Sequence, residues 1–247
     1  VFMLDGTLTI TNSTIQNCRA DGTWNGSGAG GAIWIRATVM NITSSTIDNN
    51  TNGGSGSNTV EGAGLYIYGG TTTLDKTTIS NNQNQKESGG GLHAESSPTV
   101  TITNSTFHGN SVTGDWRTGA GISIYGDATI TNTTVFNNTA TYAGGGMALA
   151  TGTITLTNVT VANNSASDNS TEGDGVYFTS GNVYVKNSIF ANNGIDFDES
   201  GSGTVNDNGY NIVENSEGYT WVATGDTTGD QASLNLSASL ADNATLN

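Results

Sequence analysis

The side chains best suited to chemistry in this sequence are aromatic rings that follow runs of glycine. Trp34, Tyr66 and His93 each take the second place in a short segment of this kind, and Tyr68 and Tyr125 stand two residues beyond such a place. The face of an aromatic ring can stack on the C–H groups of a sugar, while nearby polar groups bond the sugar hydroxyls. These positions form a candidate carbohydrate-binding face: Trp34, Tyr66, Tyr68, His93, Tyr125 and Tyr177.

Two interpretations of this aromatic set are open. Rings exposed on adjacent strands would make an apolar patch of the kind that marks a binding surface. The alternative is cross-strand stacking that only stabilises a sheet, or cover by a neighbouring loop. The variable segments between repeats carry two more rings, Trp24 and Trp116. These segments either form one binding groove together with the aromatic face or vary in sequence because nothing constrains them.

Acidic and amide side chains give two weaker candidates. Asp196, Asp198 and Glu199 are oxygen ligands of the kind that calcium prefers, although a solvated acidic edge has the same composition. The motif Asn-x-Ser/Thr occurs 12 times, and its copies at Asn25 and Asn169 are the best placed for glycosylation because they fall in loops. Repeats made of Asn, Ser and Thr also generate such motifs by composition alone.

Threonines recur in pairs separated by one residue, which predicts outward ranks on a flat sheet. Such ranks resemble the ice-binding face of several antifreeze proteins, and ice binding is a lesser alternative here. Asn41, Asp75, Tyr184 and Lys186 interrupt the ranks, and threonine is common in any exposed strand. The ranks consist of Thr9, Thr101, Thr129 and Thr155, and of Thr11, Thr43, Thr103, Thr131 and Thr157.

The residues do not assemble a convincing catalytic set. A polysaccharide hydrolase needs two carboxylates a few ångströms apart, and a lyase needs a cation-binding carboxylate cluster with a base. The 6 lysines and arginines are scattered, and His93 and His108 are too far apart in register to act as a pair. We therefore expect no catalytic residues, no metal and no cofactor other than calcium. Carbohydrate cleavage stays open beside carbohydrate binding as a function of the aromatic face, because enzymes such as pectate lyases share the fold that the repeats predict.

One phrase of the sequence recurs seven times and supplies the elements that must position these side chains. Its apolar anchors are spaced by 32, 32, 28, 28, 26 and 29 residues, and they are Ile15, Ile47, Ile79, Phe107, Val135, Val161 and Phe190. A period of about 20 to 50 residues indicates a solenoid. Each repeat holds three short segments that alternate apolar and polar residues, as strands do. The pattern predicts an all-β, right-handed parallel β-helix of about seven to eight turns with three strands per turn.

Equivalent positions of the repeats carry residues of one kind. Three apolar columns are expected to form the core. One consists of the seven anchors, and the other two are Ile10, Ile42, Leu74, Ile102, Ile130, Leu156 and Val185, and Ile33, Leu65, Leu92, Ile122, Met147 and Val176. An asparagine column is expected to form a ladder in which each amide bonds to its copies above and below, with Cys18 opening the column. The ladder consists of Asn50, Asn82, Asn110, Asn138, Asn164 and Asn193.

Composition excludes several classes of partner. With 247 residues and a net charge of −15, the chain is not expected to bind nucleic acid or an anionic membrane. The single cysteine, Cys18, excludes an internal disulfide, and no segment is apolar enough to insert in a membrane. The chain shows no signal peptide and begins inside a strand pattern, so we interpret it as a piece of a longer protein.

Two motifs carry a family resemblance over roughly residues 4–198. Gly30-Gly31-Ala32-Ile33 and Phe107-His108-Gly109-Asn110 resemble the paired G-G-A-I and F-x-x-N repeats of chlamydial polymorphic outer-membrane proteins. Asn208-Gly209-Tyr210-Asn211-Ile212-Val213 and Leu240-Ala241-Asp242-Asn243 resemble the last part of bacterial surface β-helix proteins with a C-terminal anchor, except that Ala244-Thr245 replace the usual glycine pair.

This resemblance implies an extracellular protein, on the cell surface or secreted, with an adhesin-like or structural role. The partners it implies are a surface glycan or protein of another cell, or copies of the chain end to end. We expect residues 1–199 to form the β-helix and residues 200–247 to form the last turn and a C-terminal cap around Tyr219 and Trp221.

Overall fold

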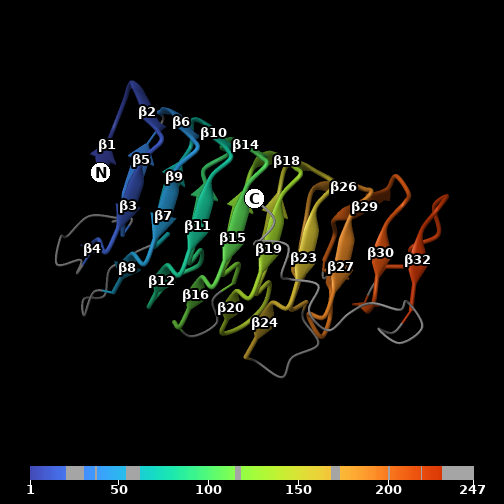
Figure 1. Ribbon diagram of the computed structural model, residues 1–247. Helices are drawn as coiled ribbons and strands as arrows, with labels where there is room; N and C mark the ends of the chain where they lie inside the picture. Colours follow the sequence, from blue (N-terminus) through green and yellow to red (C-terminus); the bar gives the residue numbers. More distant parts are fainter. Residues whose placement is uncertain are drawn as a thin grey trace.

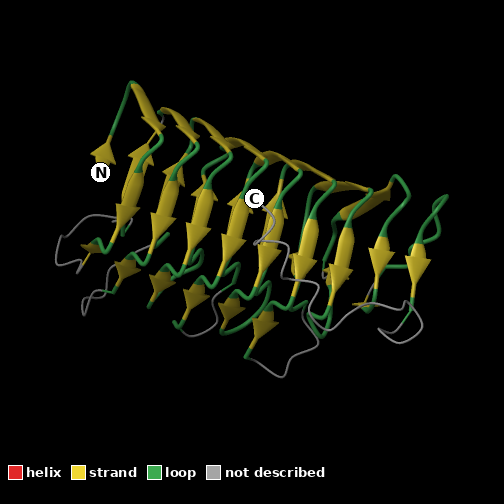
Figure 2. Cartoon of the chain, viewed as in Figure 1, coloured by secondary structure: helices red, strands yellow, loops and turns green. Residues whose placement is uncertain are grey.

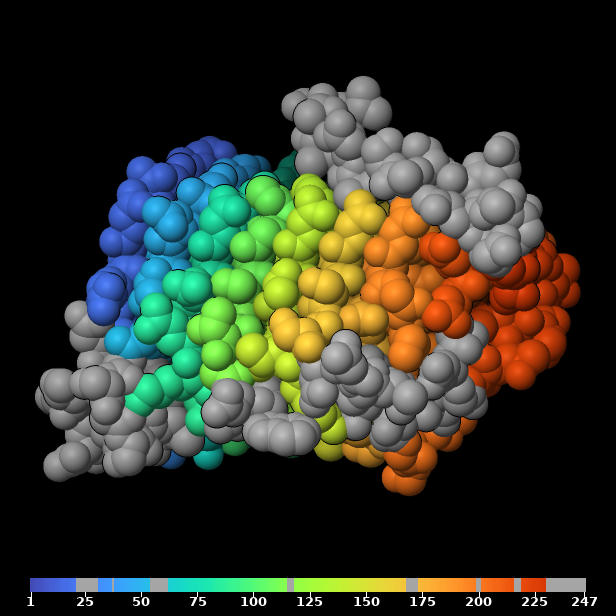
Figure 3. All heavy atoms as spheres, turned by 90° about the horizontal axis from the view of Figure 1, so that it is seen from below, coloured from blue at the N-terminus to red at the C-terminus, as the bar shows by residue number. Residues whose placement is uncertain are grey.

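The computed structural model describes residues 1–20, 31–36, 38–53, 62–114, 118–167, 173–199, 201–217 and 219–229. Strands are the regular elements of this part of the chain (Figure 2), and they pair in parallel. Successive turns follow one another along one axis (Figure 1), as the bands of colour in Figure 3 also show. Within these residues no helix is long and apolar enough to cross a bilayer. The predicted right-handed parallel β-helix is confirmed.

Two sheets carry the longer strands of each turn. In sheet A the nine strands are, in order, β1 (Phe2–Met3), β5 (Ile33–Arg36), β9 (Leu65–Tyr68), β13 (Leu92–Glu95), β17 (Ile122–Tyr125), β21 (Met147–Thr151), β25 (Val176–Phe178), β28 (Phe197–Glu199) and β31 (Ser216–Glu217). In sheet B the eight strands are β2 (Thr7–Thr11), β6 (Val39–Thr43), β10 (Thr71–Asp75), β14 (Thr99–Thr103), β18 (Asp127–Thr131), β22 (Thr153–Thr157), β26 (Asn182–Lys186) and β29 (Thr204–Asp207).

Two further sheets carry shorter strands. In sheet C the nine strands are β3 (Thr14–Gln16), β7 (Thr46–Asp48), β11 (Thr78–Ser80), β15 (Thr106–His108), β19 (Thr134–Phe136), β23 (Thr160–Ala162), β27 (Ile189–Ala191), β30 (Ile212–Val213) and β32 (Thr227–Thr228). In sheet D the six strands are β4 (Arg19–Ala20), β8 (Thr51–Asn52), β12 (Gln83–Asn84), β16 (Ser111–Val112), β20 (Thr139–Ala140) and β24 (Ser165–Ala166).

Sheet D corrects the expectation of three strands per turn, because six turns contain a fourth strand. Each of its strands has two residues, which is too short for alternation to be visible in the sequence. The second residue of each strand faces inward, where Val112 and Ala140 pack with Ala120 in a small cluster of their own. The eight strands of sheet B agree with the predicted seven to eight turns.

The three apolar columns form one continuous core from Ile33 to Trp221. Apart from the first-turn members Ile10 and Ile15, which are partly buried, the residues of the expected columns are buried. Each apolar side chain therefore packs on its copies in the turns above and below as well as across the interior.

The expected asparagine ladder is present and runs without a break. From Asn50 to Asn193, each Nδ2 donates to the Oδ1 of the next asparagine at 2.9–3.0 Å. Each Oδ1 also accepts the backbone N–H of the preceding ladder residue; Cys18 donates this bond to Asn50 at 2.9 Å. Each Nδ2 also donates a second hydrogen bond to a backbone carbonyl oxygen of the turn before, as Asn138 Nδ2 does to the Phe107 carbonyl at 3.1 Å. The buried amides are thus satisfied by one another.

The ladder ends on a carboxylate, Asp196. Its Oδ1 accepts the Nδ2 and the backbone N–H of Asn193 at 2.7 and 3.0 Å, and its Oδ2 accepts the N–H of Asn215 at 2.8 Å. Asp196 is buried, and burial raises its pKa from 3.8 to about 6 even though these N–H donors favour the ionised form.

Asparagine also has a backbone role at the corners. The residue before each ladder position adopts positive φ, for example 53° at Asn137 and 54° at Asn163, and Gly109 takes the same conformation. Asparagine tolerates this left-handed region better than most residues, so the paired asparagines of the repeat divide two tasks. The first turns the chain, and the second bonds the turns together.

The last described turns close the core with aromatic rings. Trp221 is buried and lies 5.9 Å from Phe190, 5.3 Å from Phe197 and 5.3 Å from Tyr219, measured between ring centroids. Sheets A, B and C continue past residue 199, from β29 to β32. The boundary between residues 1–199 and 200–247 stays a prediction, and Leu234, Leu236 and Leu240 lie outside the described residues.

We predict that Asn138→Ala lowers the free energy of unfolding by about 3 kcal/mol, because it leaves several buried polar groups without partners. Asn110 loses the acceptor of both its Nδ2 and its backbone N–H, and Asn164 loses one donor. Chemical denaturation followed by circular dichroism measures the change.

The matched control is Asn132→Gly at an exposed corner, where Nδ2 of Asn132 donates to Asn104 Oδ1 at 3.2 Å and its Oδ1 accepts from Asn158 Nδ2 at 2.9 Å. Glycine keeps the positive φ of that corner, and water replaces the two lost hydrogen bonds. We expect a change below about 0.5 kcal/mol. Equal effects of the two substitutions would contradict a stabilising role that is specific to the buried ladder.

A second prediction concerns pH. Asp196 binds its proton more tightly in the folded chain than in the unfolded chain, so its contribution to stability is complete below about pH 4 and is lost as pH rises to about 6. The shift of about two pKa units corresponds to about 3 kcal/mol. Subtracting the unfolding free energies of Asp196→Asn from those of the unchanged chain, across pH 3 to 8, isolates this group. A difference that is flat with pH would show that Asp196 titrates normally.

Candidate functional site

Sheet A brings most of the candidate aromatic residues together. Trp34 of β5 pairs in register with Tyr66 of β9, which pairs with His93 of β13. Their side chains lie on the outer face, because Ile33, Leu65 and Leu92 beside them belong to the core. Tyr125 of β17 lies beside His93, with ring centroids 5.7 Å apart.

The rings of this face form one continuous row. Phe2 stacks on Trp34 at 4.5 Å, Trp34 lies 5.9 Å from Tyr66, and Tyr66 stacks on His93 at 5.7 Å. These separations lie in the range of favourable aromatic pairs. The rings therefore use much of their faces on one another.

The central members of this face are not open to solvent, which fits the interpretation that the rings stack on one another or are covered. Trp34, Tyr66 and His93 are only 6%, 3% and 3% exposed. Alternation along a strand identifies the outer face but does not reveal whether that face is covered. Accessible surface remains one pleat further along the strands, where Tyr125 is 39% exposed and the Glu95 side chain is 32% exposed.

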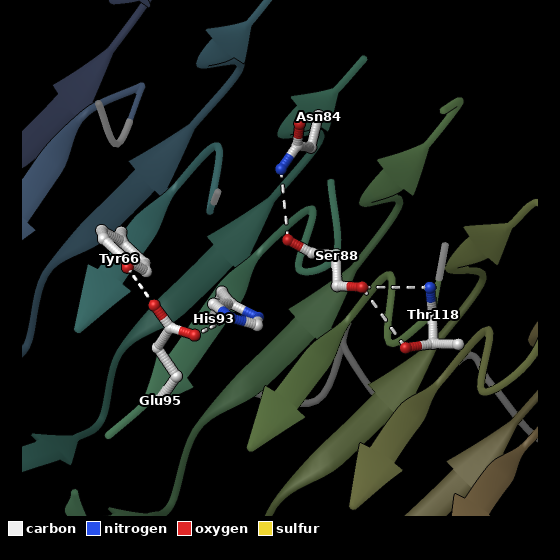
Figure 4. A network of polar contacts seen from close by, with 6 residues as sticks. All are labelled: Tyr66, Asn84, Ser88, His93, Glu95 and Thr118. Atoms are coloured by element: carbon white, nitrogen blue, oxygen red, sulfur yellow. Dashed lines mark hydrogen bonds and ion pairs between the residues drawn. The ribbon is translucent and has the colours of Figure 1, made fainter. Parts of the chain in front are cut away.

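Glu95 links two of the rings (Figure 4). The Tyr66 hydroxyl donates to Glu95 Oε1, and His93 Nε2 lies 3.9 Å from Glu95 Oε2. The carboxylate is thus held between a phenol and an imidazole at the edge of the buried row, where it can accept a hydrogen bond from a ligand hydroxyl. Glu95 is not among the candidate residues predicted for this face, although His93-Ala94-Glu95 places both side chains on one face of a strand.

The other candidates on sheet A lie beside this row or apart from it. Tyr68 is partly buried, and the Arg36 guanidinium lies over its ring at 5.3 Å, a cation–π contact. Tyr177 is separated from His93 by Ser123 and Ala148 in the two intervening strands, and it contacts Tyr142 edge to face at 6.4 Å. Trp24, Trp116, Asn25 and Asn169 lie outside the described residues.

A second polar network lies nearby, in the segment that follows sheet D (Figure 4). Asn84 Nδ2 donates to the carbonyl of Ser88 at 3.1 Å, and Ser88 Oγ accepts the backbone N–H of Thr118 at 3.3 Å. The first bond closes one connection on itself, and the second ties it to the next connection before the two enter β13 and β17.

The two histidines lie in different sheets, as their register predicted. His108 belongs to sheet C, where it stacks on Phe136 at 5.0 Å. Burial lowers the pKa of His108, and the charge of Asp48 opposes this effect. Ser80 of β11 lies between Asp48 of β7 and His108 of β15, and its hydroxyl donates a hydrogen bond to Asp48 Oδ1 at 2.7 Å. This row is a set of cross-strand contacts on another face from Glu95.

The calcium candidates are not arranged as a common ligand set in the described residues. Both carboxylate oxygens of Asp196 accept N–H groups at the end of the ladder, and Asp198 Oδ2 accepts the N–H of Gly173 at 3.3 Å. The side chain of Glu199 lies outside the described residues. In the described part of the chain, no three His, Cys, Asp or Glu residues are grouped as metal ligands. Calcium binding stays a prediction.

Sheet B displays the threonine ranks on its outer face. Thr101, Thr129 and Thr155 are in register, and so are Thr103, Thr131 and Thr157. A third rank was not predicted, although the pattern T-x-T-x-T of three strands shows it: its threonines are Thr7, Thr71, Thr99, Thr153 and Thr204.

Comparison with known proteins places this geometry in a family. A family model described as right handed beta helix region matches residues 1–234. No curated protein matches the chain. The solved structure of trypsin-treated QnrB1, a plasmid-mediated fluoroquinolone resistance protein, is similar over 94% of each chain, with 11% identity and a TM-score of 0.34. A similarity this low carries no conclusion about this chain. Because the family model covers nearly all of its 247 residues, the protein belongs to the right-handed β-helix family.

Proposed function

We propose that this chain is a non-enzymatic part of an extracellular surface protein, where it acts as an adhesin-like stalk or a structural unit. The observation that carries the proposal is the buried amide ladder from Asn50 to Asp196, which bonds each turn to the next inside a continuous core. A rod bonded in this way at every turn transmits load and holds its ends apart, as a stalk requires.

The surface chemistry supports the same proposal. With 21 acidic and 6 basic residues, the chain carries the charge of a protein that stays soluble and repels polyanions. The repeat motifs resemble those of surface β-helix proteins, and that resemblance is the ground for an extracellular location. The partner stays a prediction: it is a glycan or protein of another cell, or a second copy of the chain.

The alternative is a carbohydrate-binding or carbohydrate-cleaving β-helix that uses the aromatic face of sheet A. Burial of Trp34 and Tyr66 weakens this version, because a sugar cannot stack on covered rings. Its remaining support is the accessible pair of Glu95 and Tyr125, a carboxylate beside a partly exposed ring. Ice binding by the threonine ranks has less support, because Asp75, Tyr184 and Lys186 occupy positions in those ranks.

We predict that antibodies against the purified chain label intact cells of the organism that makes it, without permeabilisation. The control is an antibody against a cytoplasmic protein, which should label only permeabilised cells. Labelling of the chain only after permeabilisation would contradict a surface location.

A second experiment tests the absence of catalysis. The purified chain is incubated with a panel of soluble polysaccharides, and new reducing ends and unsaturated products are measured over a day. We expect neither above a heat-denatured control. Cleavage that is lost in Glu95→Gln would overturn the non-enzymatic proposal and favour an acid–base role of the carboxylate between Tyr66 and His93.

A further inference from the structure

A shallow hollow lies in the outer face of sheet B. It crosses β14, β18 and β22 near the middle of the rod and has a volume of about 250 Å³. Five threonines and one aspartate supply its outward side chains: Thr99, Thr101, Asp127, Thr129, Thr153 and Thr155. This face is separate from the aromatic row, which lies on sheet A.

The hydroxyls of this hollow are available to a ligand. In the described residues, none of the five threonine side chains hydrogen bonds to the protein, whereas the neighbouring Thr103 hydroxyl donates to Asp75 at 2.8 Å. Asp127 is exposed, and its Oδ1 accepts the N–H of Thr153 at 2.8 Å. The hollow therefore offers donors that can also accept, and one carboxylate held by the backbone.

The backbone at one end of the hollow is packed too closely for side chains. A Cβ on Gly126 would lie 2.6 Å from the carbonyl oxygen of Pro98, and a Cβ on Gly152 would lie 2.5 Å from the backbone of Gly126. These glycines immediately precede Asp127 and Thr153, which line the hollow, so successive turns pack closely beside it.

An aromatic ring borders the hollow on the next turn. Tyr184 of β26 pairs in register with Thr155 and is 36% exposed, and Asn182 pairs with Thr153. Along the rod axis, one column therefore reads Thr101, Thr129, Thr155 and then Tyr184. Strands of a sheet are about 4.8 Å apart, so the hydroxyls recur at that spacing until the ring replaces them.

The chemistry of this surface selects a class of ligand. Hydroxyls that donate and accept, threonine methyls, a carboxylate and a ring edge or face match the hydroxyls and C–H groups of sugars. The net charge of −15 and the carboxylate of Asp127 disfavour acidic polymers. An ice lattice needs a regular array, which Asp127, Tyr184 and Lys186 break. A chain of repeating sugar units that lies along the axis meets similar contacts in each turn.

We propose that the hollow across β14, β18 and β22 binds a neutral polysaccharide chain that runs along the rod axis and stacks one sugar on Tyr184. This inference rests on the proposed adhesive role, for which it names the ligand class. It moves the sugar site from the buried aromatic row of sheet A to the open face of sheet B.

The test is retention of the purified chain on insoluble cellulose, chitin, xylan and mannan, with cross-linked polygalacturonate as the acidic comparison. The main variant combines Thr101→Val, Thr129→Val and Thr155→Val, which remove three hydroxyls but keep side-chain shape and strand preference. We expect retention on at least one neutral polymer, and an apparent affinity about tenfold or more lower in this variant. Tyr184→Ala should weaken retention as well.

Two matched controls locate the site. Thr9→Val removes an outward threonine from the same column outside the hollow, and Tyr125→Ala alters the accessible ring of sheet A. Both should bind as the unchanged chain does. Unfolding midpoints within error of the unchanged chain show that each variant is folded.

Four outcomes of the retention experiment would overturn the proposal. These are no retention on any neutral polymer, equal retention by the triple variant, loss of retention in Tyr125→Ala alone, or preference for polygalacturonate. Inhibition of ice recrystallisation that is lost in the triple variant would also overturn it, in favour of ice. The surface labelling of intact cells is independent of this face, so failure here leaves the proposed location and stalk role standing.

Discussion

The structure depends on the requirement that a buried side-chain amide be fully hydrogen bonded. The side-chain partners of an asparagine inside this β-helix lie in the turns above and below, because its side-chain neighbours in the same turn are mostly apolar, and only some Nδ2 groups also donate to a carbonyl of their own turn. That requirement is met when each turn presents an asparagine at the same place, and it holds the turns in register. The outward-facing columns have the same register as the interior. The row of rings on sheet A and the ranks of hydroxyls on sheet B form because the interior contacts fix the register between successive turns.

The repeats made much of this predictable. A column of six asparagines and three apolar columns require stacking whatever the loops do, so the fold and the core followed from the spacing of residues such as Asn110 and Phe107. The two-residue strands of sheet D were missed because periodicity needs more than two residues to be seen. The role of Asp196 was missed because it follows Asn193 by three residues instead of a whole turn, and only the chain's path brings its carboxylate to the end of the ladder.

The candidate site was harder to predict for a physical reason. Alternation places Trp34, Tyr66 and His93 on the outer face, and the structure agrees. Exposure, however, depends on what lies over that face, and no periodicity of the strand encodes it. The rings stack on one another and are buried, and this outcome favours the interpretation that they stabilise the sheet. The hollow of sheet B could not be predicted as a binding site, because threonine is common in any exposed strand and its ranks therefore do not distinguish a ligand site from an ordinary surface.

The contrast between the two faces bears on where a ligand can bind. Binding energy comes from groups whose partners are water in the free protein, since a group already paired within the chain must first lose that partner. On sheet A the phenol of Tyr66 is paired with Glu95, and the rings are paired with one another. On sheet B the hydroxyls of Thr101, Thr129 and Thr155 have only water to lose. By this criterion the threonine face of sheet B is a better binding surface than the aromatic face of sheet A. The aromatic face then belongs with the amide ladder, as a second set of contacts that holds neighbouring turns together.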